Sequence, residues 1–214
     1  MDGVLADTGQ FHFQSWVKMA EEIGFTFTKD FFDQTFGQQS IPITRILVGP
    51  NIDQRNIEKW ANLKEHYYRE MIKTKIKPLP GVINLIRNLK AEGFKIAVGS
   101  SGPPENVDLL LQSLKINDVF DLIITAAEVQ NSKPAPDVFL KVAEELQIIP
   151  NHCIVIEDAP VGIKAAKRAG MKVIALTTTH HSSDLLEANT VVKDLSFINL
   201  KLILELLNIK NSKH

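Results

Sequence analysis

The sequence predicts an α/β fold in which a doubly wound parallel sheet carries an inserted helical unit. From Pro78 onward, strands alternate with helices at the spacing of βαβ units. The strand segments there, such as IAV, LII, IVI and VIAL, are apolar on both sides, as strands are when helices cover both faces of a parallel sheet. Between Phe11 and Arg69, in contrast, apolar residues recur at helical spacing, which predicts a small all-helical unit.

The helical unit shows four apolar stripes, over residues 16–23, 31–36, 43–48 and 57–72. Glycine and proline residues separate these stripes and mark the turns between helices. We expect a group of five phenylalanines to form the core of the unit. They are Phe25, Phe27, Phe31, Phe32 and Phe36.

The α/β part begins with Pro80 as the first residue of a helix, a position at which the missing amide proton of proline costs nothing. Gly93 and Gly170 each close a helix. Helices are expected over 82–89, 105–114, 138–146, 159–169 and 197–207, and strands over 95–99, 122–125, 153–156, 172–176 and 190–192. Residues 210–214 are expected to fray.

Composition narrows the possible functions. The 24 basic and 25 acidic residues nearly cancel, so no broad basic surface is expected for nucleic acid or an anionic membrane. No apolar stretch approaches the ~18 residues that span a bilayer, and no signal-peptide pattern is present. The single cysteine, Cys153, excludes an internal disulfide and stands in an apolar run as a small hydrophobe without a chemical role. We expect a cytoplasmic monomer.

The residues that follow each strand are the candidates for chemistry, because ligands of a doubly wound sheet bind beyond the carboxyl ends of its strands. The strand over 95–99 leads into Ser100, Ser101 and Gly102. Two hydroxyls and free backbone amides at the start of a helix form an anion cradle. The simpler alternative is a serine that caps the helix.

Lys133 begins a second candidate segment, in which Pro134 and Pro136 precede a helix. The prolines hold the segment extended and fix the direction of the lysine, which indicates an anionic partner. The alternative is an ordinary solvated lysine. If the partner is a phosphate, Lys133→Met should abolish phosphate binding with little change in stability.

Two adjacent acids, Glu157 and Asp158, follow the strand over 153–156. Neighbouring carboxylates repel one another unless a cation lies beside them, and hard oxygen ligands suit Mg²⁺. The alternative is that Asp158 caps the next helix, although a cap does not explain Glu157. With Lys133, the hydroxyl cradle and Asp2, these acids supply what phosphoryl transfer requires: positive charge and donors for the phosphate oxygens, and carboxylates to attack and to move protons.

Four motifs in this order resemble those of the haloacid dehalogenase superfamily: DGVLADT, Ser100, Lys133 in SKPAPDVF, and Glu157-Asp158 in IEDAPVGIKAAKRAG. The resemblance covers nearly the whole chain and points to the branch of β-phosphoglucomutase-like and phosphatase-like members with a helical cap. It implies a Rossmann-like core of residues 1–8 and 78–214 and a cap of residues 9–77 that closes over the substrate.

The resemblance implies that three acids serve the reaction and its metal ion. Asp2 would be the general acid/base and would also lend its backbone carbonyl to Mg²⁺. Glu157 and Asp158 would hold the metal directly or through water.

It also implies which residues meet the substrate, a small phosphorylated molecule. Ser100 and Lys133 would act on the transferring phosphoryl group, with Ser101 and Gly102 beside them as binding residues. His12 would line the site and help to gate the acid/base; the alternative for His12 is a partly buried helix histidine.

Two features depart from the family pattern. The family nucleophile is an aspartate two residues before Asp2, at the end of a central strand, and both this position and the strand would precede Met1. We therefore expect a start assigned at an internal methionine, and little turnover by the 214 residues as written. In addition, the segment over 37–40 has no arginine where mutases of this branch hold a second phosphate.

These features predict a Mg²⁺-dependent phosphatase that hydrolyses a small phosphorylated metabolite, such as a sugar phosphate, through an aspartyl-phosphate. A β-phosphoglucomutase-type phosphomutase and a non-catalytic binder of a phosphorylated metabolite are the alternatives. His180 and His181 indicate a polar loop rather than a metal site, because adjacent histidines point apart and no third ligand stands near them.

Overall fold

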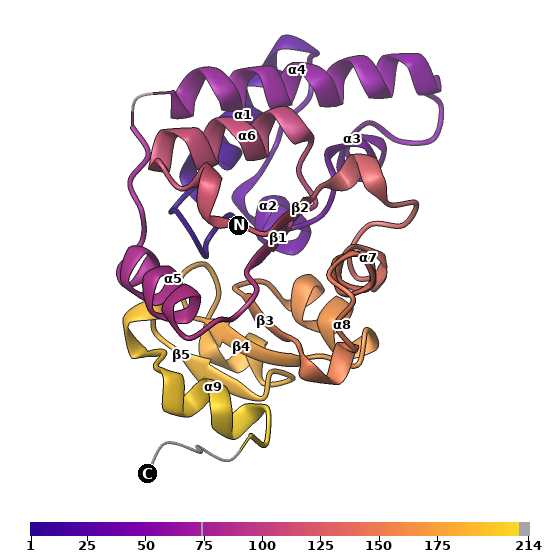
Figure 1. Cartoon of the computed structure of the whole chain (residues 1–214). Coiled ribbons are helices and arrows are strands. Elements are labelled where there is room, and N and C mark those ends of the chain that lie inside the picture. The colour runs from indigo at the N-terminus through magenta and orange to yellow at the C-terminus, as the bar shows by residue number, and fades with distance from the viewer. Residues whose placement is uncertain (74, 210–214) are drawn as a thin grey trace.

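The structure is a computed structural model that describes residues 1–73 and 75–209. The tail that was expected to fray, residues 210–214, lies outside the described residues. Helices α1 to α4 lie together at one end of the molecule, and β3, β4 and β5 lie toward the other (Figure 1). No described helix has the length and apolar character needed to cross a membrane.

The helical unit consists of α1 (Gly9–Glu22), α2 (Lys29–Thr35), α3 (Ser40–Val48) and α4 (Gln54–Ile72). The helices α1 and α3 both pack against α4. All five phenylalanines lie in the core of this unit as predicted, with Phe27 and Phe32 buried and the other three partly buried against them. The unit therefore has an apolar core of its own, which also contains Trp16, Met19 and Ile43.

The rest of the chain alternates between helices and parallel strands. Its helices are α5 (Val82–Ala91), α6 (Pro104–Leu114), α7 (Asp137–Glu145), α8 (Pro160–Arg168) and α9 (Leu200–Leu206). Its strands are β1 (Ala97–Gly99), β2 (Leu122–Ile124), β3 (Ile154–Glu157), β4 (Lys172–Leu176) and β5 (Thr190–Val192). Every strand pairing is parallel, which confirms the predicted type of sheet.

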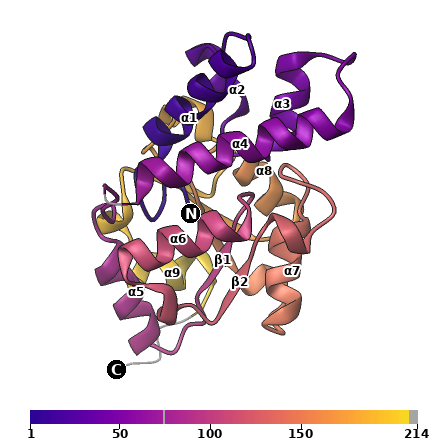
Figure 2. The same ribbon diagram turned by 90° about the horizontal axis from the view of Figure 1, so that it is seen from above.

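Alternate residues of β4 enter two different hydrophobic cores. Ile174 and Leu176 join the core that contains residues of α5, α6 and α9. Val173 and Ala175 join the core that contains residues of α7 and α8. Because successive side chains of a strand point to opposite faces, helices cover both faces of the sheet, and the predicted doubly wound arrangement is confirmed. Figure 2 shows α5, α6 and α9 on one side of β1, with α7 on the other.

The strands form two sheets, one with the order β1-β2 and one with the order β3-β4-β5. Among the described residues, no strand pairs with the second edge of β1 or with the second edge of β3. The burial of the strands follows this division. Four of the five residues of β4 are buried, whereas β1 buries one residue of three and β3 two of four.

The predicted helix over 197–207 and the predicted strand over 95–99 both begin too early. The side chain of Asn199 accepts a hydrogen bond from the amide of Leu202 at 3.0 Å, so α9 begins after this cap. The amide of Ile96 donates to the carboxylate of Asp121 at 2.8 Å, and β1 begins one residue later. In both cases a polar side chain sets the boundary, which apolar periodicity does not detect.

Candidate active site

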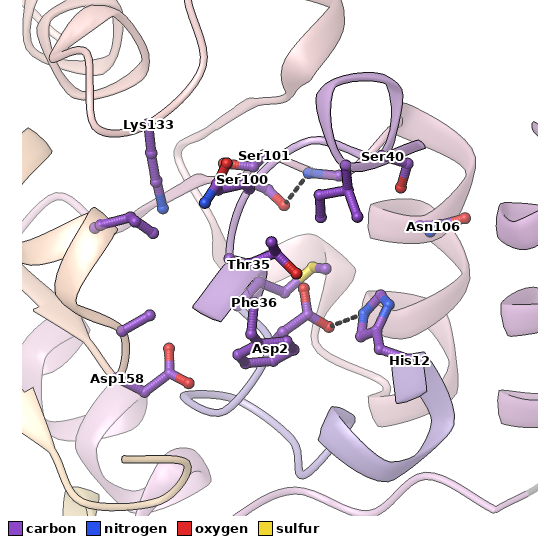
Figure 3. Close-up of a pocket in the computed structure, with 18 of the residues that line it drawn as sticks. Asp2, His12, Thr35, Phe36, Ser40, Ser100, Ser101, Asn106, Lys133 and Asp158 are labelled. Carbon is purple, nitrogen blue, oxygen red and sulfur yellow. Dashed lines mark hydrogen bonds and ion pairs between the residues drawn. The ribbon is translucent and has the colours of Figure 1, made fainter. Parts of the chain in front are cut away.

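A cavity of about 70 Å³ lies between the helical unit and the carboxyl ends of β1 and β3. All eight site residues that the sequence predicts line this cavity, and Figure 3 shows several of them around it. They are Asp2, His12, Ser100, Ser101, Gly102, Lys133, Glu157 and Asp158. Residues that are up to about three quarters of the chain apart therefore meet in one place, as the convergence of parallel strand ends predicts.

The first turn of the chain brings Asp2 beside Asp158. Gly3 has φ +63° and its amide donates to the carbonyl of Ala6 at 2.9 Å, which closes the turn. A Cβ atom on Gly3 would lie 2.0 Å from Oδ2 of Asp158. Only glycine permits both the left-handed conformation and this close approach, so the Asp-Gly pair in the sequence has a definite structural cause.

Three groups of the N-terminal and helical segments bind the carboxylate of Asp2. Its Oδ1 accepts hydrogen bonds from Thr8 Oγ1 at 2.6 Å and from Tyr68 Oη at 3.2 Å, and it lies 3.1 Å from Nε2 of His12. The rings of His12 and Tyr68 stack with their centroids 3.8 Å apart. Burial opposes the ionisation of Asp2, but the charge and hydrogen bond of His12, the charge of the N-terminus and the hydrogen bond from Thr8 together outweigh burial and hold the pKa of Asp2 well below its ordinary value.

A buried polar chain continues from His12 into the helical unit and reaches α6. Lys64 Nζ lies 2.8 Å from Nδ1 of His12 and donates to Oε1 of Glu65 at 3.0 Å. The other oxygen of Glu65 accepts from Asn106 of α6 at 2.6 Å. Burial opposes the ionisation of Glu65 as well, but the charges of Lys64 and His12 and the hydrogen bonds from Ser40 and Lys64 together outweigh it and lower the pKa of Glu65. The predicted position of His12, in the site and beside Asp2, agrees with this geometry.

Apart from Asp2 and His12, the residues of this buried polar network were not identified by the sequence analysis. Lys64, Glu65 and Tyr68 lie on α4, where an apolar stripe with interspersed charges reads as an ordinary amphipathic helix. Thr8 follows Asp7 in the first motif and could have been identified, since a tight turn can bring a hydroxyl six residues along the chain back to the carboxylate of Asp2. Nothing in the spacing pointed to Asn106.

Ser100 lies at the end of β1 and is buried. Its hydroxyl accepts a hydrogen bond from the amide of Gly102 at 3.1 Å, and its own amide donates to Ile124 of β2 at 2.9 Å. The helix cap of α6 is Pro103, which makes no side-chain hydrogen bond. The alternative in which Ser100 caps the helix is therefore wrong, and its side chain faces the cavity instead.

Lys133 is buried, with a side chain that is 7% exposed, so the alternative of a solvated lysine is wrong. Its Nζ forms an ion pair with Oε1 of Glu157 at 2.5 Å and lies 3.5 Å from the carbonyl of Gly99. Asn131 donates two hydrogen bonds to Asp137, which ties down the loop that carries the lysine. A cation thus lies between the ends of β1 and β3, where an anion would be bound.

Asp158 does not cap α8, as the alternative required, because the cap position is Ala159 and makes no side-chain hydrogen bond. The carboxylate of Asp158 accepts from Thr179 Oγ1 at 2.5 Å instead. Burial, and then the negative charge of Glu157, raise the pKa of Asp158. For Glu157 burial also opposes ionisation, but the charge and hydrogen bond of Lys133, the charge of the N-terminus and the amide of Asp158 together outweigh it and the pKa of Glu157 is lowered.

The loop after β4 takes part in the site, which the sequence analysis missed. Thr179 binds Asp158, and Nδ1 of His180 lies 3.0 Å from the carbonyl oxygen of Asp158. The ring of His180 also lies 6.5 Å from that of Phe36, between centroids. The prediction of a polar loop was right, but it did not include this contact with Asp158, because the fold brings β4 next to β3 only in three dimensions.

The three acids predicted as metal ligands differ in their surroundings. Asp2 is bound by groups of the helical unit, Glu157 by Lys133, and Asp158 by Thr179. Within residues 1–73 and 75–209, no group of three or more His, Cys, Asp or Glu side chains is arranged to hold a metal ion. The chemistry of the donors nevertheless fits Mg²⁺, since hard oxygens lie at one strand end and a cation would relieve the charge that raises the pKa of Asp158.

Comparison with known proteins identifies the family. Residues 1–176 match the haloacid dehalogenase-like hydrolase family. The chain belongs to this family. The resemblance inferred from the motifs is thereby confirmed, as are the fold class and the prediction of an enzyme.

Relatives within this haloacid dehalogenase-like family include both mutases and phosphatases. Beta-phosphoglucomutase from Bacillus subtilis is 33% identical over 212 residues, which cover 96% of this chain and 92% of the relative. A phosphorylated carbohydrates phosphatase from Thermotoga maritima is 29% identical over 197 residues, with 89% of each chain covered. The crystal structure of beta-phosphoglucomutase from Clostridium difficile has a TM-score of 0.88 at 30% identity, covering 97% of this chain and 94% of that one.

Proposed function

We propose that this protein is a Mg²⁺-dependent phosphatase that hydrolyses the phosphate ester of a small sugar-like metabolite. The observation that carries the proposal is that all eight predicted residues line one cavity, with Lys133 and the Ser100 turn on one side and Asp2 on the other. Figure 3 shows these groups around a common space. In addition, the named activity of the Thermotoga maritima relative is that of a phosphatase of phosphorylated carbohydrates.

In this proposal each residue has a defined task. Lys133 and the hydroxyl and amides at Ser100 to Gly102 hold the phosphoryl oxygens. When bound, Mg²⁺ supplies positive charge that offsets the charge of the phosphate; Asp158 would hold it with the backbone carbonyl of Asp2, and Glu157 would contribute directly or through water.

In the mechanism that the resemblance implies, an aspartate two positions before Asp2 attacks phosphorus and forms the aspartyl-phosphate as the ester oxygen of the substrate leaves. As an ionised carboxylate, Asp2 takes the proton from the water that cleaves this intermediate. The phosphate of an incoming substrate raises the pKa of Asp2 by like-charge repulsion, which allows Asp2 to carry the proton that the leaving oxygen needs. The low pKa of the unliganded site fits the first of these states.

Hydrolysis, rather than transfer to a second position of the sugar, is favoured by the part of the cavity that the helical unit lines. Among the described residues that line the cavity there is no arginine. The one cation from this side, Lys64, is already paired with Glu65 and His12. A second phosphate group would find no unpaired positive charge there. We therefore propose a substrate that carries a single phosphate group.

The remaining parts of the proposal concern organisation. We assign residues 1–8 and 78–214 to the core and residues 9–77 to a cap that closes over the substrate and excludes water. The Asp2 contacts with His12 and Tyr68 support this assignment, since they join the two parts at the site. A cytoplasmic monomer remains our prediction.

The test compares two forms of the chain, the 214 residues and a form extended so that an aspartate precedes Met1. The extended form should release inorganic phosphate from hexose monophosphates with Mg²⁺ and lose this activity with EDTA, whereas Lys133→Met in the same form should be inactive. Isomerisation of a hexose phosphate without release of phosphate would favour the mutase. Binding without turnover would favour the non-catalytic binder, and full Mg²⁺-dependent activity in the 214-residue form would show that the nucleophile is assigned wrongly.

A further inference from the structure

Glu65 and Asn106 form a polar wall of the proposed substrate cavity on the side away from Lys133. Glu65 comes from α4 of the helical unit and Asn106 from α6, and both side chains line the cavity. In Figure 3, Ser40 and Asn106 lie on one side of the cavity and Lys133 on the other, with Ser100 between them. A substrate whose phosphate binds at Lys133 therefore extends toward this wall.

Charged neighbours fix the orientation of the Asn106 side chain. A guanidinium only donates and a carboxylate only accepts, so Oδ1 of Asn106 must face Arg69 and its Nδ2 must face Glu65. The two hydrogen bonds are 2.9 Å from Arg69 Nη1 to Oδ1 and 2.6 Å from Nδ2 to Oε2 of Glu65. Because Asn106 is also 1% exposed, its amide is held firmly with the NH₂ group beside Glu65.

Glu65 and Asn106 each have one hydrogen-bonding position left. Oε1 of Glu65 accepts from Ser40 and, at 3.0 Å, from Lys64, whereas Oε2 accepts only from Asn106. Since each carboxylate oxygen accepts about two hydrogen bonds, Oε2 retains one acceptor position. One proton of the Asn106 NH₂ group goes to Glu65, and the other has no acceptor among the described residues. A free acceptor and a free donor thus lie side by side.

The charge of Glu65 limits what can bind at this wall. Burial opposes its ionisation, but the charges of Lys64 and His12 and the hydrogen bonds from Ser40 and Lys64 together keep the pKa of Glu65 below its ordinary value. A buried carboxylate repels a second anion that is brought beside it. Lys64, whose Nζ lies 3.0 Å from Glu65, likewise repels a cation. A hydroxyl, which is neutral and both donates and accepts, suits the wall best.

Given the proposed function, on which this step rests, we propose that Glu65 and Asn106 determine specificity: together they bind a hydroxyl of the substrate, and Glu65 excludes substrates with a second anionic group. The hydroxyl donates to Oε2 of Glu65 and accepts from Nδ2 of Asn106. Because Glu65 belongs to the helical unit and Asn106 to α6, this hydroxyl joins the two parts of the chain across the cavity. A polyhydroxylated ester therefore stabilises the closed site, and an ester with a carboxylate in the same place does not.

Two sugar phosphates that differ in one group test the proposal. Glucose 1-phosphate carries a hydroxymethyl group where glucuronic acid 1-phosphate carries a carboxylate on the same ring. Calorimetry with Mg²⁺ would measure the dissociation constants of both esters, and of inorganic phosphate, for the 214-residue chain, Glu65→Gln, Asn106→Ala and Glu58→Gln. Glu58 is exposed on the same helix and is the matched control. The ratio of the two ester constants cancels any general change in phosphate affinity.

The parent should bind glucose 1-phosphate more tightly than glucuronic acid 1-phosphate by about tenfold or more. Glu65→Gln, which keeps the shape of the side chain but removes its charge, should admit the carboxylate and reduce this ratio below about threefold. Asn106→Ala should weaken the binding of glucose 1-phosphate by about three- to tenfold, while glucuronic acid 1-phosphate stays excluded because Glu65 keeps its charge. Glu58→Gln should behave as the parent.

Binding of inorganic phosphate separates this specificity from the proposed function. A parent that binds inorganic phosphate but binds both esters equally would overturn the role of Glu65 and Asn106 and leave the proposed function intact. A Glu65→Gln protein with the selectivity of the parent would do the same, whereas a parent that does not bind phosphate would overturn both. Thermal melts show whether each variant folds. If Glu65→Gln does not fold, Asn106→Ala decides, and unchanged binding of glucose 1-phosphate by that variant would overturn the proposal.

Discussion

Lys64 Nζ and His12 Nδ1 lie 2.8 Å apart in the interior of the protein. A lysine ammonium has donors only, so Nδ1 of His12 must accept, and the ring proton lies on Nε2, which faces Asp2 at 3.1 Å. Lys64 therefore selects the tautomer in which His12 donates to Asp2. Since Lys64 lies on α4 and Asp2 in the first turn, the proton chemistry of Asp2 depends on the position of the helical unit.

The substitution Lys64→Met should free His12 to adopt the other tautomer and weaken its bond to Asp2. The loss of this donor should raise the pKa of Asp2 and, in the extended form used to test the proposed phosphatase, reduce turnover roughly tenfold or more. Ring ¹⁵N chemical shifts of His12 would report the tautomer directly. Lys59→Met, at an exposed position of the same helix, is the matched control and should change neither quantity. An unchanged tautomer in Lys64→Met would contradict the assignment.

The substitution Gly3→Ala should destabilise the protein because it introduces two separate costs. The left-handed backbone costs about 1 to 2 kcal/mol, and overpacking against Asp158 costs about 1 to 3 kcal/mol more. Gly93→Ala is the control, since its φ is also positive at +80° but no atom lies within 4 Å of the added Cβ. Denaturant unfolding of both variants separates the two costs, and an equal loss of stability would show that the contact with Asp158 is unimportant.

The sequence was sufficient to predict that the candidate site residues gather at one cavity. Ser100 and Asp158 follow strands in the chain, and the carboxyl ends of parallel strands converge whatever the details of packing. The spacing of the apolar residues likewise distinguished the helical unit from the part of the chain that forms the sheet. These predictions depend on local patterns that the fold has to satisfy.

The partners of these residues could not be predicted in the same way. Whether Asp158 binds a helix amide or Thr179 depends on how β4 lies beside β3, which no spacing rule contains. The bonds of Tyr68 and Lys64 to the site depend on how α4 lies above the first turn. The signals for such residues are weak, because a tyrosine or lysine in an amphipathic helix usually has a role in packing or solvation.

The ion pair of Lys133 with Glu157 corrects the expectation that Lys133→Met would leave stability nearly unchanged. Both side chains are less than a tenth exposed, so removing the lysine leaves a buried carboxylate without its partner. The expected cost is about 3 to 5 kcal/mol. The double variant Lys133→Met/Glu157→Gln should recover most of this stability but still fail to bind inorganic phosphate or a metal fluoride.

Thermal melts and calorimetry on both variants check this prediction. A single variant that is as stable as the parent would mean that the ion pair contributes little. A double variant that binds the phosphate analogue with unchanged affinity would show that Lys133 serves Glu157 alone.

The raised pKa of Asp158 predicts how stability depends on pH and on Mg²⁺. Burial and the charge of Glu157 raise this pKa above the ordinary value of 3.8, so the folded protein holds a proton that the unfolded chain loses. Without metal, stability should therefore fall as the pH rises above 3.8 and the carboxyl ionises in the folded state. Mg²⁺ binds the ionised form, and it should raise the melting temperature more at about pH 8 than at about pH 5.

The measurement is a set of melts at both pH values with and without Mg²⁺, on the parent, on Asp158→Asn and on Asp184→Asn, an exposed acid that serves as control. The Asn variant at 158 should lose the response to Mg²⁺ and much of the decline with pH, because its amide cannot ionise. Asp184→Asn should behave as the parent. An equal Mg²⁺ response at both pH values, or a full response in Asp158→Asn, would place the metal on other ligands and remove Asp158 from the proposed site.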